Sequence, residues 1–199
     1  MISALVAELE ARAAPGRVVL VGIDGRGGSG KSTLARTIAQ GLRESAVVEF
    51  DDFYRPSATR LPPGDADIGG DFEWRRLRDQ VLLPLSRGEA ARYQRYDWGT
   101  DSMAEWHTVP ARGVVVVDGN YATREELRAL YHFRIWVDAP HDVRLARGLE
   151  RGGPNTRERW LDEWMPEEER YLAAQEPWRF ADLIVDGAAP IPSCRPGGS

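Results

Sequence analysis

The chain has 199 residues, of which 42% are hydrophobic and 29% charged, and its formal net charge is −5. This length suits one domain with a substantial core, and the composition is that of an ordinary soluble globular protein. The acidic balance argues against nucleic acid as the main partner, because nucleic-acid binding usually leaves a basic footprint.

The cysteine content indicates the cellular setting. Cys194 is the single cysteine, so no internal disulfide can form, and a reducing, cytoplasmic location is the simplest interpretation. Residues 1–12 read as an amphipathic helix and not as a signal peptide, and no apolar stretch approaches the ~20 residues that span a bilayer. We therefore expect a cytoplasmic protein with no membrane or nucleic-acid partner; the oligomeric state, including a homo-oligomer, stays open.

Short apolar runs alternate with helical patterns along the chain, which is typical of a parallel sheet covered by helices. In chain order, the expected elements are residues 17–23 (strand), 31–43 (helix), 46–50 (strand), 72–87 (helix), 91–98 (edge strand), 113–117 (strand), 123–130 (helix), 133–137 (strand), 141–151 (helix), a helix restarting at 155, and 182–186 (strand). Thr123 and Glu126 have the spacing of a capping box. The polar loop at 55–70 is long enough to suggest a functional segment.

Residues 25–32 (G-R-G-G-S-G-K-S) match the phosphate-binding pattern G-x-x-x-x-G-K-[ST], known as Walker A. Glycines let several backbone N–H groups point at one phosphate, and the helix that follows adds its positive end. Lys31 is the only lysine beside 25 arginines, and it stands where a wide, planar guanidinium would fit poorly. The residues expected to bind the nucleotide are Gly25, Gly27, Gly28, Ser29, Gly30, Lys31, Ser32 and Thr33.

The strand–loop–helix setting of this motif defines the expected fold. It is α/β: a three-layer P-loop nucleoside triphosphate hydrolase fold with a parallel five-stranded sheet and a small lid. We expect a single domain over residues 1–187, with the lid at about 144–160, and a flexible tail at 188–199.

Acidic residues follow two of the expected strands. Asp51 and Asp52 come after residues 46–50, and Asp118 comes after 113–117. Ligands of open parallel sheets bind beyond the carboxyl ends of the strands. Acidic residues also commonly end strands, but beside a phosphate loop one carboxylate can hold Mg²⁺, directly or through water, together with the Ser32 hydroxyl, and another can accept the proton of an attacking hydroxyl. Asp51 and Asp118 are the candidates for these two roles.

These segments resemble the uridine kinase and nicotinamide riboside kinase group of P-loop kinases (the phosphoribulokinase/uridine kinase group) over about residues 17–187. The resemblance lies in residues 51–56 (D-D-F-Y-R-P), 95–98 (R-Y-D-W), 117–119 (V-D-G) and 180–184 (F-A-D-L-I). It implies that Asp51 is the general base on a nucleoside 5′-hydroxyl. It also implies that Asp118 joins the Mg²⁺ shell at a position where the family has Glu.

Two departures from the family pattern concern the acceptor. Uridine kinases have a His shortly after the Y-D-F stretch that helps to read the pyrimidine, whereas Asp101 stands here and His107 is too far along. Residues 67–72 (D-I-G-G-D-F) replace the F-D-H-P segment of the family. The resemblance therefore supports phosphoryl transfer without identifying the acceptor.

Arg144, Arg147 and Arg151 fall on one face of the helix expected at 141–151. The family resemblance implies an Arg-rich lid here, with Arg147 and Arg151 as catalytic cations and Arg144 near the substrate; an ordinary solvated face is the alternative. Mobile cations suit phosphoryl transfer because negative charge spreads over the moving group.

Aromatic side chains could stack on a flat acceptor. Tyr54, Tyr96 and Trp98 are the candidates for this role, whereas Trp74 reads as core. Asp71 is the candidate for sugar hydroxyls, although Asp67 and Glu73 compete with it.

The leading hypothesis is an ATP- and Mg²⁺-dependent small-molecule kinase with a nucleoside-like acceptor. One alternative is the same chemistry on a non-nucleoside alcohol, such as a vitamin precursor, a sugar or an antibiotic. Another is a nucleotide-dependent switch or binding module, which would not need a base at Asp51. The sequence leaves the choice between ATP and GTP open.

Overall fold

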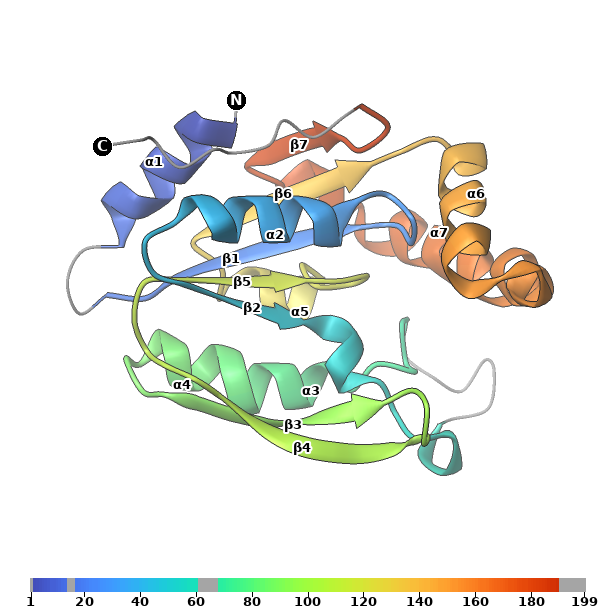
Figure 1. Ribbon diagram of the computed structural model, residues 1–199, viewed down its shortest axis with the longest axis horizontal. Helices are drawn as coiled ribbons and strands as arrows, with labels where there is room; N and C mark the ends of the chain where they lie inside the picture. The colour runs from blue at the N-terminus through green and yellow to red at the C-terminus, as the bar shows by residue number, and fades with distance from the viewer. Residues whose placement is uncertain (1, 14–16, 61–67, 190–199) are drawn as a thin grey trace.

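The protein is built around a five-stranded parallel sheet with the strand order β2-β5-β1-β6-β7 (Figure 1). The computed structural model describes residues 2–13, 17–60 and 68–189. The strands are β1 (Val19–Gly25), β2 (Ser45–Glu49), β5 (Val114–Asp118), β6 (Phe133–Asp138) and β7 (Leu183–Asp186). This confirms the expected fold class and places the ends of β1, β2 and β5 level with one another.

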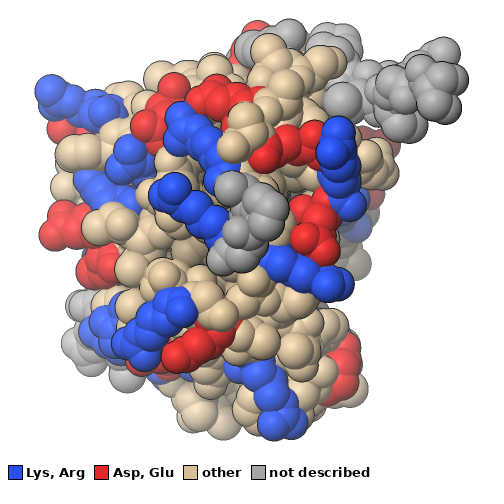
Figure 2. All heavy atoms as spheres, turned by 90° about the vertical axis from the view of Figure 1, so that its left-hand side faces the viewer, with Lys and Arg blue, Asp and Glu red and all other residues tan. Residues whose placement is uncertain are grey.

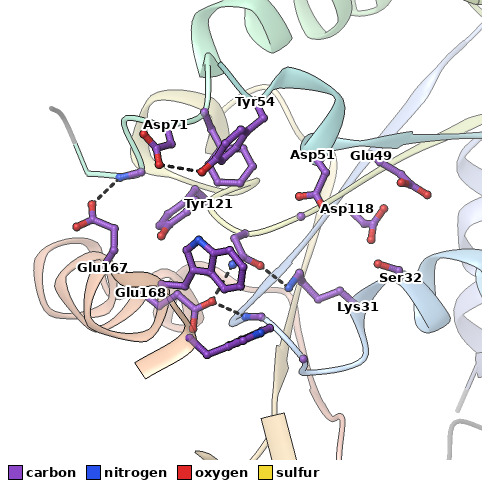
Figure 3. A pocket seen from close by; sticks show the side chains of 18 of the residues that line it. Lys31, Ser32, Glu49, Asp51, Tyr54, Asp71, Asp118, Tyr121, Glu167 and Glu168 are labelled. Carbon is purple, nitrogen blue, oxygen red and sulfur yellow. Dashed lines mark hydrogen bonds between the residues drawn. The ribbon is translucent and has the colours of Figure 1, made fainter. Parts of the chain in front are cut away.

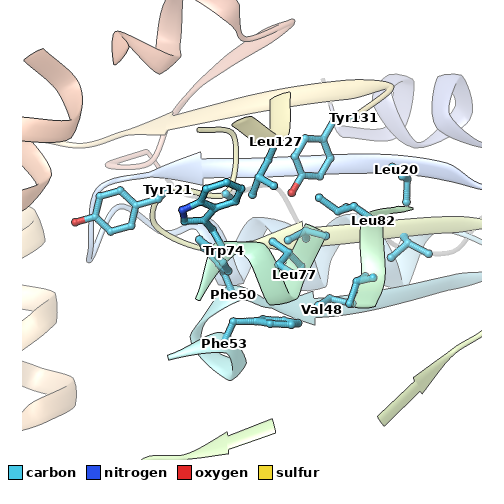
Figure 4. Close-up of a cluster of buried hydrophobic side chains, with 14 of the residues drawn as sticks. Leu20, Val48, Phe50, Phe53, Trp74, Leu77, Leu82, Tyr121, Leu127 and Tyr131 are labelled. Carbon is cyan, nitrogen blue, oxygen red and sulfur yellow. The ribbon is translucent and has the colours of Figure 1, made fainter. Parts of the chain in front are cut away.

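Helices cover both faces of the sheet, because successive side chains of a strand point to opposite faces. Val114 and Val116 pack with α1 (Ile2–Arg12) and α2 (Lys31–Gly41) in one core. Val115 and Val117 pack in a second core, drawn in Figure 4, against the helical run Trp74–Ser86, α5 (Glu125–Arg128) and α7 (Met165–Gln175). Trp74 is buried in this second core, as the sequence indicated.

The helical run expected at 72–87 is α3 (Trp74–Leu77), a π-helical turn (Arg78–Leu82) and α4 (Leu83–Ser86). The wider turn lies directly ahead of Pro84, which has no N–H to donate to the preceding turn. The restart expected at 155 is a 3₁₀ turn (Pro154–Thr156) followed by a π-helical turn (Arg159–Trp164) that leads into α7. Helix α6 (His141–Gly152) and the two turns that follow it lie beyond the ends of β1 and β6 (Figure 1).

The strand expected at 91–98 is confirmed, but it does not lie at the edge of the main sheet. β3 (Ala91–Asp97) pairs antiparallel with β4 (Ser102–Val109) in a separate two-stranded sheet. Its alternating pattern reflects one face packed on the second core, through Ala91 and Tyr93, and one face turned to solvent. β4 escaped sequence analysis because most of its side chains are exposed or half-buried.

The capping box expected at Thr123 and Glu126 is also wrong. Helix α5 begins at Glu125, after an extended Arg124. The Thr123 hydroxyl instead donates a hydrogen bond to Asp24 Oδ2, over 2.9 Å. Asp24 is fully buried, so its carboxylate needs donors more than the exposed end of a short helix does.

The face at the amino ends of the strands carries basic and acidic side chains interspersed (Figure 2). Within the described residues, no helix is long and apolar enough to cross a membrane. The tail with Cys194 lies outside the described residues, as does Asp67.

Candidate active site

One cavity of about 1260 Å³ lies at the carboxyl ends of the strands, beside the phosphate loop (Figure 3). Single-ligand pockets are typically roughly 300–1,000 Å³, so this volume suits two substrates side by side. The cavity brings together most of the residues chosen from sequence: Gly27, Gly28, Gly30, Lys31, Ser32, Thr33, Asp51, Tyr54, Asp71, Trp98, Asp118, Arg147 and Arg151. Gly25, Ser29, Tyr96 and Arg144 lie outside its lining.

The backbone of the phosphate loop requires glycine at several positions. Gly28 and Gly30 have φ of 76° and 102°, in the region that side chains disfavour. A Cβ added to Gly28 would lie 2.4 Å from the Arg144 carbonyl oxygen. The loop is therefore packed closely against α6, and the first amides of α2 follow it without intrahelical partners. These amides are the groups that a phosphate would take up.

Lys31 lies at the base of the cavity with its ammonium already oriented. Its Nζ donates to Asn120 Oδ1 over 2.7 Å and to the Arg26 carbonyl over 3.0 Å. Burial lowers the pKa of Lys31, while the charges of Glu168 and Asp24 oppose that shift. Asn120 was not singled out from sequence, although it stands just two residues past the end of β5, at the edge where the site was expected.

Asp118 and Ser32 form the expected metal-binding corner. Burial raises the pKa of Asp118 to about 6, although the nearby Ser32 hydroxyl and Lys31 stabilise the carboxylate. Asp118 Oδ1 is buried without a hydrogen-bond partner among the described residues, as suits an oxygen that takes a cation. The described residues contain no ready-made cluster of three or more His, Cys, Asp or Glu for a metal. The corner therefore fits Mg²⁺, which commonly uses one or two protein oxygens plus phosphates and water.

Glu49 is an additional carboxylate that sequence analysis missed. It ends β2, lies opposite Asp118 in the strand register and lines the cavity. Desolvation and the neighbouring Asp52 and Asp51 charges raise its pKa. Glu49 could have been found from its place at the end of a short apolar strand. The two aspartates that follow it, Asp51 and Asp52, were chosen as the strand-end carboxylates instead.

Asp51 and Asp52 take different positions. Both lie in a 3₁₀ turn (Phe50–Phe53), but only Asp51 lines the cavity. Asp52 Oδ2 accepts a hydrogen bond from the Tyr93 hydroxyl over 2.9 Å, which ties it to the β3–β4 sheet. Desolvation raises the pKa of Asp51, and the charges of Lys31 and Arg151 pull it back down. Asp51 is thus a carboxylate facing the same space as Lys31.

Aromatic side chains line the side of the cavity away from the phosphate loop. The rings of Tyr54 and Trp98 lie 4.2 Å apart between centroids, and the Tyr54 hydroxyl donates to Asp71 Oδ2 over 2.8 Å. Tyr96 is buried behind them, with its hydroxyl donating to Asp101. It supports this wall without lining it.

Asp71 and Glu73, two of the candidates for binding the acceptor's hydroxyls, differ in whether they face the cavity. Asp71 lines the cavity, whereas Glu73 does not and is held by Arg55 over 2.7 Å.

The three arginines expected to share a lid face take different positions. Arg147 Nη1 donates to the carbonyl oxygens of Gly187, at 2.8 Å, and Gly28, at 3.3 Å. Arg151 is exposed at the cavity rim. Arg144 is fully buried behind the phosphate loop, where its Nη1 donates to Glu168 Oε2 over 2.9 Å. Its position does not support a role for Arg144 in substrate contact.

The segment after α6 contributes cavity residues that were not among the candidates chosen from sequence. Trp160 and Trp164 line the cavity, and their rings meet edge to face. Glu167 Oε1 accepts from the Gly69 amide over 2.9 Å. Glu168 stood in a run of three glutamates with nothing in the sequence to mark it.

Comparison with known proteins gives consistent relatives. No family model matches the chain. The uridine kinase of Deinococcus deserti is 32% identical over 186 residues, which cover 85% of this chain and 87% of the relative. The uridine kinase of Halobacterium salinarum is 28% identical over 183 residues, covering 85% of this chain and 80% of the relative.

Two solved structures show the same architecture. A protein described as a possible uridine kinase from Bacillus stearothermophilus has a TM-score of 0.72 at 25% identity, covering 93% of this chain and 97% of its own. A candidate fructose transport system kinase from Silicibacter sp. TM1040 has a TM-score of 0.71 at 25% identity, covering 92% of this chain and 98% of its own.

Proposed function

Because the chain belongs to the uridine kinase family of P-loop kinases, we propose that it transfers the γ-phosphoryl group of ATP to a hydroxyl group of a nucleoside-like acceptor. Family membership makes the chain an ATP-dependent phosphotransferase with an alcohol acceptor. The observation that carries the assignment of roles is that the phosphate loop, Lys31 and Asp51 line one cavity, which also has an aromatic wall.

The phosphate loop and Lys31 hold the triphosphate. The amides at the start of α2 donate to phosphate oxygens, and the Lys31 ammonium donates to the β- and γ-phosphates. An ammonium has three donors, and because two of them already meet Asn120 Oδ1 and the Arg26 carbonyl, the third is left for the triphosphate.

Asp51 acts as the general base. It takes the proton from the acceptor hydroxyl as the oxygen attacks the γ-phosphorus, and the bond to the β–γ bridging oxygen breaks. Desolvation raises the pKa of Asp51, which makes it a better proton acceptor, while the charges of Lys31 and Arg151 oppose that shift.

Ser32 and Asp118 would hold Mg²⁺, with Glu49, opposite Asp118 in the strand register, as a further carboxylate at this corner. When bound, Mg²⁺ would neutralise charge on the phosphate oxygens. Asp118 is one methylene shorter than glutamate, so the Ser32 hydroxyl is the better candidate for the direct protein ligand.

Arg151 and Arg147 act from the lid, at about residues 144–160. Arg151 is the cation at the cavity rim, free to close over the transferring group. Arg147 donates to the carbonyl oxygen of Gly28 within the phosphate loop and to that of Gly187 after β7, and its role is to hold the nucleotide end of the site.

The acceptor lies between Asp51 and the wall formed by Tyr54 and Trp98, with Asp71 as the group for its hydroxyls. A non-pyrimidine or non-nucleoside alcohol is the second candidate, and one observation favours it. Asp101 stands where uridine kinases have a pyrimidine-reading His, and it is already used by Tyr96, Ser57 and Arg60. The similarity to a candidate fructose transport system kinase is compatible with this alternative.

An acceptor panel tests the proposal. Purified protein with Mg²⁺ and ATP or GTP is offered uridine, cytidine, purine nucleosides, pyridine nucleosides and simple sugars, and the products are read by mass spectrometry. We expect a monophosphate of at least one nucleoside. Phosphorylation of sugars alone would move the assignment to the second candidate. Nucleotide binding with no phosphorylated product across the panel would favour a switch.

A further inference from the structure

Helix α7 contacts the phosphate loop through the buried carboxylate of Glu168. Glu168 is only 2% exposed, and its Oε1 accepts from the Gly27 amide over 2.6 Å and from Asn120 Nδ2 over 2.8 Å. Its Oε2 accepts from Arg144 Nη1 over 2.9 Å. One carboxylate therefore joins the phosphate loop, the segment after β5 and helix α6 (Figure 3).

The same contact reaches Lys31. Asn120 donates to Glu168 through Nδ2 and accepts from Lys31 Nζ through Oδ1 over 2.7 Å. The orientation of this amide is thus fixed: Lys31 can only donate, so Oδ1 faces Lys31 and Nδ2 is turned to Glu168 Oε1. A change at Glu168 is expected to reach the catalytic ammonium through one intermediate side chain.

We propose that Glu168 is a positioning residue for phosphoryl transfer: it fixes the Gly27 amide directly and the Lys31 ammonium through Asn120. The claim rests on the proposed function, since it assigns Glu168 a role in the same site. Glu168 itself need not touch the nucleotide.

Steric contacts support this arrangement. A Cβ added to Gly27 would lie 2.8 Å both from Glu168 Oε1 and from the Trp160 ring. The loop backbone is thus pressed directly against the α7 carboxylate and its aromatic neighbour. This closeness leaves little freedom for Gly27 once Glu168 is in place.

A second residue of α7 provides independent support. Tyr171 lies three residues after Glu168, hence on the same face of the helix, and its hydroxyl donates to Asp24 Oδ2 over 2.8 Å. Asp24 in turn accepts from the Gly25 amide over 2.6 Å. Helix α7 therefore holds both the start and the third residue of the phosphate loop.

Arg144 explains how a carboxylate can be placed beside a triphosphate site. An unpaired negative charge there would repel phosphate, but the fully buried Arg144 guanidinium pairs with Glu168. A glutamine at position 168 would keep the shape but could place an NH₂ group against Arg144 or against Gly27 and Asn120. It would also remove the closer of the two carboxylates that face Arg144, the other being Glu169 at 4.0 Å.

The test compares Glu168→Gln with Glu169→Gln. Glu169 is the next residue and exposed; it pairs with Arg26 over 2.8 Å and lies 4.0 Å from Arg144, but it contacts neither the Gly27 amide nor Asn120. Dissociation constants for Mg²⁺ and a non-hydrolysable ATP analogue are measured together with kcat and both KM values. We expect Glu168→Gln to weaken analogue binding at least tenfold and to lower kcat at least tenfold, with the KM for acceptor within threefold. Glu169→Gln should stay within threefold of wild type throughout.

The possible outcomes separate this inference from the proposed function. If wild type does not bind the analogue, the proposed function fails. If wild type binds it and Glu168→Gln binds equally well with equal kcat, even at a lower melting temperature, Glu168 is only structural and the inference is overturned. Should Glu168→Gln not fold, Asn120→Ala decides, because Asn120 is only half-buried. At least fivefold weaker binding supports the relay to Lys31, and unchanged binding overturns it.

Discussion

Glu49 and Asp118 stand opposite each other in the register of neighbouring parallel strands β2 and β5, and both line the cavity beside Lys31. Two carboxylates on adjacent strand ends repel each other until a cation or a proton arrives. Burial and the Glu49 charge both raise the pKa of Asp118, which reaches about 6. Without a metal, the negative charges of Glu49 and Asp118 therefore destabilise the folded protein, and bound Mg²⁺ would neutralise them.

Asp118→Asn should stabilise the nucleotide-free protein while abolishing Mg²⁺-dependent activity. A pKa raised from 3.8 to about 6 means that ionised Asp118 costs on the order of 3 kcal/mol in the fold. The cost is absent below about pH 4, where the carboxyl is protonated in both states, and complete above about pH 6. Denaturant unfolding from pH 4 to 7.5 measures it. The variant's advantage over wild type should grow up to about pH 6.5, and a constant difference would contradict the assignment.

Lys31→Arg should lose nucleotide affinity nearly as fully as Lys31→Ala. The ammonium occupies a buried spot with acceptors at 2.7 and 3.0 Å, which a wider, planar guanidinium does not fit. We expect at least a tenfold rise in the dissociation constant for a fluorescent Mg²⁺–ATP analogue in both variants. Binding of Lys31→Arg within twofold of wild type would show that charge alone suffices.

Gly28→Ala should disable the phosphate loop, and Gly88→Ala serves as its matched control. The two glycines have nearly the same φ, 76° and 75°, so the intrinsic strain of an added side chain is similar, about 1 kcal/mol. A Cβ at Gly28 would lie 2.4 Å from the Arg144 carbonyl oxygen, whereas at Gly88 nothing lies within 4 Å. Calorimetric titration should give at least tenfold weaker ATP-analogue binding for Gly28→Ala only. Equal affinities in the two variants would refute a packed loop.

Trp98→Ala should raise the KM for the acceptor about tenfold and leave the KM for ATP unchanged, because stacking on the acceptor is lost. Trp106→Ala is the control: both tryptophans belong to the β3–β4 hairpin and are half exposed, at 49% and 50%, but only Trp98 lines the cavity. Steady-state kinetics with the best acceptor from the panel measures this. A similar KM change in both variants would indicate a general effect on the hairpin.

The central strands β1, β5 and β6 were predictable because they are buried on both faces and therefore read as continuous apolar runs. The partner of β3 was not, because β4 carries exposed residues such as Glu105 and Trp106 and shows no apolar run. The capping box at Thr123 failed for a tertiary reason: Asp24, distant in sequence, takes the Thr123 hydroxyl.

The residues of the candidate site also fall into two groups, those that a local sequence pattern marks and those that only the folded structure brings into the site. Lys31, Asp51 and Asp118 were found because motif spacing and strand ends mark them. Arg144 was placed on the correct helix, but its burial depends on Glu168, which lies 24 positions later and has no local signal. Asn120 and Glu168 matter through contacts between elements distant in sequence, and periodicity does not encode those contacts.

The most direct test of the account is the behaviour of Asp51→Asn beside Asp52→Asn. The two aspartates are adjacent, but only Asp51 lines the cavity, while Asp52 is bound by Tyr93. The measurement is kcat for the best acceptor together with the dissociation constant for the Mg²⁺–ATP analogue. We predict that Asp51→Asn lowers kcat about a hundredfold to ten-thousandfold with ATP-analogue affinity within threefold, and that Asp52→Asn changes kcat less than fivefold. An Asp51→Asn protein that turns over at the wild-type rate would contradict the account.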